Sequence, residues 1–213
     1  MQTAIRSTLN RVIKNLLLLC VCVVTNVQAA LLNPGATIHV VSAAEPSGAS
    51  LLATTNVIFH TDFFSGSLVS KVWEQDNSNP WGGLTFGYRL KYDENCQESL
   101  GWLTLGGFAG LFTDVNYFSS GTTPHHAGRS ESGNTIAFSF LSLHGDNHNG
   151  NEEKSAWLII QTDGTDWGVN PLIGINSTTI SVATFAPAAV PEPTSLTLLV
   201  LAGVVVLTRR SKV

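Results

Sequence analysis

The sequence predicts an all-β fold, an antiparallel β-sandwich or jelly roll, built as one domain over residues 30–186. Short segments with apolar side chains at alternating positions recur along this part of the chain, and clusters of turn-forming residues separate them. No stretch within it keeps a helical period of 3.6 residues over three turns, so helices connecting parallel strands are not expected. The segment is long enough to form one hydrophobic core.

The first 29 residues are typical of a signal peptide. Basic residues up to Lys14 precede an apolar run over residues 16–24, and small residues follow it. This order predicts cleavage by signal peptidase after Ala29 or Ala30. The apolar run is shorter than the roughly 20 residues that a membrane-spanning helix needs.

The clearest strand is the segment 84–92, because its large apolar residues occupy alternate positions and so share one face. These residues are Leu84, Phe86, Tyr88, Leu90 and Tyr92. The other predicted strands are 37–41, 56–60, 65–73, 101–105, 113–117, 135–143, 155–162 and 178–185. Turn chemistry separates them at 76–80, 93–95, 119–121, 144–151 and 163–164, whereas most of 31–55 is weakly patterned.

The C-terminal segment, residues 187–213, differs from the rest of the chain. After a short linker, Pro191, Glu192 and Pro193 predict an extended and exposed stretch, because the two prolines fix φ and remove two backbone donors. The uncharged run 195–208 follows, and as a single helix it would span only about 21 Å against the ~30 Å of a bilayer core. Arg209 and Arg210 come next, which places the C-terminus in the cytoplasm.

The Pro-Glu-Pro motif, the hydrophobic segment and the Arg209-Arg210 pair occur in this order, and together they resemble the PEP-CTERM sorting signal of Gram-negative bacteria. The resemblance implies an exported precursor, held in the membrane by a single C-terminal hydrophobic helix until an exosortase-type enzyme processes it. It also implies a final location at the cell surface or in the extracellular matrix. The alternative is a buried C-terminal strand or helix, which would need neither the Pro-Glu-Pro break nor the basic end.

Removal of both signals would leave an acidic domain with a single cysteine. Residues 30–189 contain 14 Asp and Glu and 5 Lys and Arg, a net charge of −9, whereas the whole chain carries −4. Nucleic acid is therefore not an expected partner. Cys96 has no second cysteine with which to form an intrachain disulfide.

Two tryptophans are candidates for binding extracellular polysaccharide. Trp81 and Trp167 both stand in loop-like contexts beside Gly and polar residues, where a flat ring could stack on a sugar. The alternative is that both rings cap the open end of the sandwich. Trp102 and Trp157 lie within predicted strands and are expected in the core.

The loop 144–153 gathers His144, Asp146 and His148, which are weak candidates for metal ligands. The loop does not match the calcium-binding pattern, because His148 and Gly150 stand where Asp or Asn is needed. The alternative is a solvated hairpin loop, and no cofactor is expected.

Catalysis is not expected. Ser132 replaces the second glycine that a nucleophile elbow around Ser130 would need, and no zinc-protease motif is present. Carboxylates could form a glycosidase pair only if the fold brought two of them together; the candidates are Glu74, Asp76, Asp93, Glu94, Glu98 and Asp114. The sequence therefore predicts an exported, non-catalytic structural component, with a carbohydrate-binding module as the alternative and a glycan-active hydrolase as a third interpretation.

Overall fold

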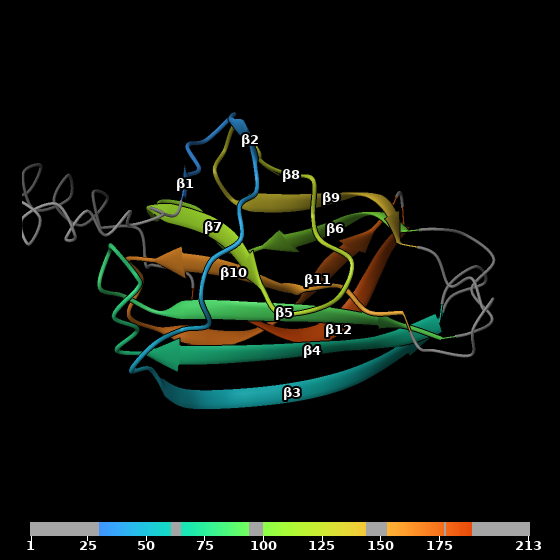
Figure 1. Ribbon diagram of the computed structural model, residues 1–213, viewed down its shortest axis with the longest axis horizontal. Helices are drawn as coiled ribbons and strands as arrows, with labels where there is room; N and C mark the ends of the chain where they lie inside the picture. The colour runs from blue at the N-terminus through green and yellow to red at the C-terminus, as the bar shows by residue number, and fades with distance from the viewer. Residues whose placement is uncertain (1–29, 61–64, 94–99, 144–152, 177, 189–213) are drawn as a thin grey trace, which may run out of the picture.

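The computed structural model describes residues 30–60, 65–93, 100–143, 153–176 and 178–188. Within these ranges the chain is all-β and contains no helix. Two six-stranded sheets pack face to face in a sandwich-like arrangement, and every pair of neighbouring strands is antiparallel (Figure 1). The predicted fold class is confirmed at this level. The expected signal peptide and C-terminal helix lie outside the described residues.

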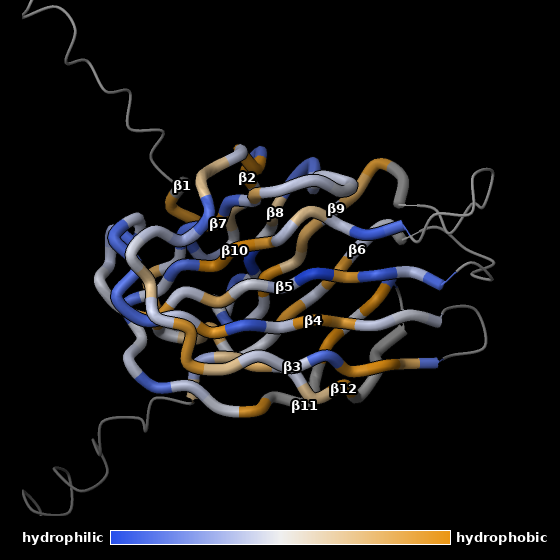
Figure 2. The backbone as a smooth tube through the Cα atoms, turned by 60° about the horizontal axis from the view of Figure 1, so that its bottom comes forward, coloured by the Kyte–Doolittle hydropathy of each residue, from blue (hydrophilic) through white to orange (hydrophobic). Residues whose placement is uncertain are grey.

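The first sheet, called sheet A here, consists of six strands in the order β1-β7-β10-β5-β4-β3. Their bounds are β1 Ala30–Leu31, β7 Thr113–Phe118, β10 Trp157–Thr162, β5 Thr85–Tyr92, β4 Ser65–Glu74 and β3 Ser50–His60. The polar segments of β4 and β5 appear blue in Figure 2 and contain Lys71, Arg89 and Lys91.

The second sheet, sheet B, has the order β12-β11-β6-β9-β8-β2. Its strands are β12 Thr178–Pro187, β11 Trp167–Ile175, β6 Leu100–Gly106, β9 Thr135–Leu143, β8 His126–Arg129 and β2 Thr37–His39. Two of its strands were not predicted: β8, which is only four residues long, and β11, which contains Pro171. A third strand, β12, extends beyond the predicted range 178–185 to Pro187.

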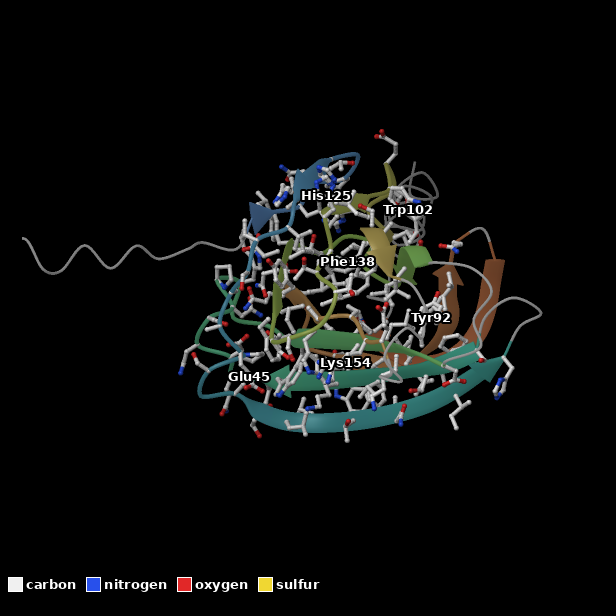
Figure 3. All side chains as sticks on the ribbon, turned by 45° about the vertical axis from the view of Figure 1, so that its right-hand side comes forward. Glu45, Tyr92, Trp102, His125, Phe138 and Lys154 are labelled. Carbon is white, nitrogen blue, oxygen red and sulfur yellow. The ribbon has the colours of Figure 1, made fainter. Side chains whose placement is uncertain are left out.

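The core lies between the sheets and follows the alternation of the sequence. All five apolar residues of the segment 84–92 are buried in it, as their period of two predicts. Sheet B contributes Leu103, Leu105 and Phe138 from the other side. Figure 3 shows Phe138 and Tyr92 in the interior of the molecule.

Among the described residues, hydrogen bonds join the sheets beside β12 and beside β8. Beside β12, the Tyr88 hydroxyl donates to the Phe185 carbonyl at 2.6 Å, and the Phe185 amide donates to the Ser70 hydroxyl at 3.3 Å. Beside β8, the Arg129 guanidinium is 6 % exposed and donates to five oxygens. These are the carbonyls of Leu32, Phe108, Leu111 and Gly133 and the hydroxyl of Thr113.

A second apolar cluster covers the outer face of sheet A. It consists of Trp73, Phe118, Trp157 and Ile159, with Ala49 packed against it. The connection between β2 and β3 crosses this face in Figure 1, which brings Ala49 over the sheet. Trp157 is therefore buried, as expected, although it does not belong to the core between the sheets.

Candidate functional site

Most of the predicted site residues lie outside the described part of the chain. This holds for Ala29 at the cleavage site, for Pro191, Glu192, Pro193, Arg209 and Arg210 of the sorting signal, and for His144, Asp146 and His148 of the predicted loop. Ala30 begins β1 and pairs with Val115 of β7. The described strands thus start at the predicted cleavage site and end at Pro187, shortly before the Pro-Glu-Pro motif.

Trp81 lies in the loop before β5 and is already stacked on another ring. Its ring centroid is 5.0 Å from that of Phe112, and the two planes differ by 18°. The Trp81 amide donates to the Asn79 side chain at 2.9 Å, while the buried indole N–H has no hydrogen-bond partner among the described residues. One face of the ring is therefore occupied by the protein.

Trp167 begins β11, so it is in a strand rather than in a loop. It packs edge to face on Phe185 of β12 at 4.9 Å and is 36 % exposed. Trp81 and Trp167 contact different partner rings, Phe112 and Phe185. The contacts described here thus do not join them in one binding site.

The most exposed tryptophan of the described residues is Trp102, which the sequence places in the core. Its side chain is 52 % exposed, so this expectation is wrong. Leu103 and Leu105 of the same strand point into the core, and the period of two turns Trp102 to the outer face of sheet B. The alternation of residues 100–105 is consistent with an outward-facing Trp102. It was not recognised in the sequence because apolar side chains occupy both faces of this strand.

Three histidines gather near Trp102 on the same side of the molecule. The ring centroids of His125 and His126 are 4.0 Å apart, and His39 lies 5.3 Å from the first and 5.6 Å from the second. Partial burial lowers the pKa of His125, and repulsion from His126 and His39 lowers it further. Both effects disfavour the charged form of His125. Figure 3 shows His125 and Trp102 above Phe138.

These imidazoles do not form a ready metal site. Among the residues that the structure describes, no group of three or more His, Cys, Asp or Glu side chains is arranged to hold a metal ion. In its neutral form an imidazole instead offers one hydrogen-bond donor and one acceptor.

Two of the candidate carboxylates, Asp76 in the loop after β4 and Asp114 on β7, both lie beside Gln161 of β10. Asp76 accepts hydrogen bonds from the Ser47 amide, the Ser78 amide and hydroxyl, the Thr85 hydroxyl and the Gln161 amide, at 2.7 to 3.2 Å. Burial alone would raise the pKa of Asp76, but the hydrogen bonds outweigh it and lower the pKa. The hydrogen bonds of the Asp76 carboxylate therefore hold the loop after β4 in place.

The pKa of Asp114 is shifted in the opposite direction. It is paired with Gln161 across β7 and β10 and is only 3 % exposed. Its Oδ1 atom has no hydrogen-bond partner among the described residues, and burial raises its pKa to about 6. A carboxyl group with a raised pKa beside one with a lowered pKa is a pattern found in glycosidases. Here both groups are almost completely covered.

Comparisons of the chain with protein-family models, with curated proteins and with solved structures found no match. Within the described ranges there is also no helix of the length and hydrophobicity needed to cross a membrane.

Proposed function

We propose that the protein is an exported component of the cell surface or extracellular matrix, delivered through its C-terminal sorting signal. The observation that carries this proposal is the tripartite tail of Pro191-Glu192-Pro193, an uncharged run and Arg209-Arg210. The described strands occupy the interval between the two proposed signals. This arrangement is what a precursor with removable ends requires.

In this proposal, signal peptidase removes residues 1–29 and an exosortase-type enzyme cuts near the Pro-Glu-Pro motif. The short apolar run of the tail suits a temporary anchor, because at about 21 Å it is shorter than the ~30 Å hydrocarbon core. The domain itself is a structural component without catalytic activity. Its burial of Asp76 and Asp114 leaves neither carboxyl group open to a glycan chain, which favours this role over hydrolysis.

The test is intact-mass measurement of the protein from a Gram-negative host with and without an exosortase-type enzyme. With the enzyme, we expect the product to lack residues 196–213. Glu192→Ala should retain them, because the motif is what the enzyme recognises. The control is Glu45→Ala, which changes the exposed glutamate of a Glu-Pro dipeptide in the β2–β3 connection and should be processed normally. Recovery of the complete C-terminus from cells that contain the enzyme would contradict the proposal.

Carbohydrate binding is the second candidate function. The observation that favours it is Trp102, a large aromatic ring 52 % exposed on the outer face of a sheet. Aromatic rings are common platforms for ligands that combine an apolar face with polar groups. In this role the domain would attach to exopolysaccharide outside the cell.

A further inference from the structure

The strands of sheet B are almost without charge. Arg129 is the only Asp, Glu, Lys or Arg in β2, β6, β8, β9, β11 and β12, and it points inward and is buried. The strands of sheet A, by contrast, contain Lys71, Glu74, Arg89, Lys91 and Asp114. Surfaces designed for solubility contain about 25–35 % Lys, Arg, Glu and Asp. The outer face of sheet B departs from this composition.

A row of large side chains crosses this face. The strand register aligns His39 with His126, His126 with Ser139, and Ser139 with Trp102. At about 4.8 Å per strand, the row extends about 14 Å from His39 to Trp102. Ser139 is covered and bonds to the backbone of His126, so the imidazoles and the indole are the groups that face outward.

The next row on the same face consists of small residues. It runs Thr37, Gly128, Ala137, Thr104 and Gly174 through the same register. A Cβ added to Gly128 would lie 3.2 Å from the side chain of Thr37, and a Cβ added to Gly174 would lie 3.2 Å from the side chain of Thr104. The two threonine side chains therefore lie beside the two glycines. This row therefore carries only small side chains, whereas the neighbouring row carries the large rings.

The position of Trp102 is fixed by its backbone. The Asn176 side-chain carbonyl accepts hydrogen bonds from the amides of Gly101 at 2.7 Å and Trp102 at 3.2 Å, and the Asn176 amide donates to the Trp102 carbonyl at 3.0 Å. Asn176 has a φ of 52°, in the left-handed region that Asn tolerates better than most residues. A register shift between Leu100 and Trp102 accompanies this arrangement, as is usual where a bulge redirects a side chain.

We propose that this face binds an uncharged polysaccharide chain, with the Trp102 ring stacked on a sugar and the imidazoles of His39 and His126 bonding to its hydroxyls. An imidazole in its neutral form both donates and accepts a hydrogen bond, as sugar hydroxyls do. An anionic polymer would be repelled by a domain of net charge −9, and the described strands of this face contain no outward-facing Lys or Arg to offset this. The proposal rests on the carbohydrate-binding candidate above and locates its site on sheet B instead of at Trp81 or Trp167.

The experiment is affinity electrophoresis of the full chain from an exporting host through gels containing a neutral polymer, either β-glucan, galactomannan or dextran, with anionic alginate as the charged control. We expect retardation by at least one neutral polymer and none by alginate. Trp102→Ala should reduce the association constant at least tenfold with an unchanged melting temperature, and His126→Ala should reduce it as well. Trp167→Ala, the matched control on β11, should bind as the wild type does.

Several outcomes would overturn the proposal. They are the absence of retardation by every neutral polymer, binding to alginate alone, and unchanged binding by Trp102→Ala. A second copy of the chain is the competing occupant of the face. If light scattering shows a dimer that Trp102→Ala converts to a monomer while polymer binding persists, the face is a self-association surface. Processing of the C-terminal tail is measured separately, so it can succeed where this proposal fails.

Discussion

Asp114 illustrates how the covered outer face of sheet A changes a single residue. Its carboxyl group is buried, and Oδ1 accepts no hydrogen bond from any described residue. Burial therefore raises the pKa of Asp114 to about 6. The folded protein therefore holds this proton more tightly than the unfolded chain does. The associated stability is complete below about pH 4, is lost as the pH rises toward 6, and stays lost above that.

The Asp114→Asn variant tests this reasoning. Because Asn is neutral at every pH, the variant should be more stable than the wild type at pH 7 by about 1–3 kcal/mol, and the difference should disappear near pH 4. Denaturant unfolding at both pH values measures it. The exposed Asp166→Asn serves as the control and should change stability by less than about 0.5 kcal/mol. A less stable Asp114→Asn at pH 7 would show that the carboxylate has a favourable partner.

At the scale of the element, β5 shows what the sequence predicts and what it does not. The alternation of large apolar residues in 84–92 predicted both the strand and its inward face, and both are confirmed. The other face of the same strand could not be predicted, because it is covered by Trp73 of β4 and by the β2–β3 connection. Such coverage depends on a chain path that no local pattern contains.

Gly87 of β5 offers a test of that coverage. A Cβ at this position would lie 2.5 and 2.7 Å from ring carbons of Trp73, so Gly87→Ala must displace the indole. We expect a loss of about 1–3 kcal/mol in the free energy of unfolding, the usual cost of overpacking. Gly168→Ala on β11 is the matched control, because nothing lies within 4 Å of the added Cβ. Equal stability of the two variants in urea unfolding would contradict the packing of Trp73 on β5.

Other elements escaped prediction for local reasons. The first half of β3 is largely exposed, so its sequence lacks the apolar alternation of a half-buried strand. β8 has only four residues, and β11 includes Pro171 at a register shift between Asn170 and Leu172, where a proline interrupts an otherwise strand-like pattern. Trp102 was misplaced because a large apolar ring in a strand usually belongs to a core.

At the scale of the whole molecule, one buried cation links the two sheets. Arg129 belongs to β8 of sheet B, yet it donates to the Thr113 hydroxyl of sheet A and to the Leu32 carbonyl that follows β1. The sequence shows Arg129 only as one of five basic residues in the domain. Its role depends on carbonyl groups from residues 32, 108, 111 and 133, which only the tertiary fold brings together.

Arg129→Met should therefore destabilise the entire domain. The variant retains part of the aliphatic volume but removes the donors for several buried oxygens, and each unsatisfied buried group costs about 1–3 kcal/mol. We expect a loss of at least about 3 kcal/mol and a single cooperative transition at a lower temperature, measured by calorimetry. Lys154→Met, which removes an exposed cation, should leave the transition nearly unchanged. A similar midpoint for the two variants would show that the guanidinium is not a structural link.

The hydrogen bonds of Asp76 also bear on the order in which the molecule assembles. Its partners include Ser47, 29 residues earlier, and Gln161, 85 residues later, so its set of hydrogen bonds is complete only once β10 has joined β5 and the β2–β3 connection has crossed sheet A. Contacts between such distant segments require loop closure before they form, so we expect them to form late in folding. Interactions that are absent from the folding transition state mainly slow unfolding. Asp76 would thus extend the lifetime of the folded state more than it hastens folding.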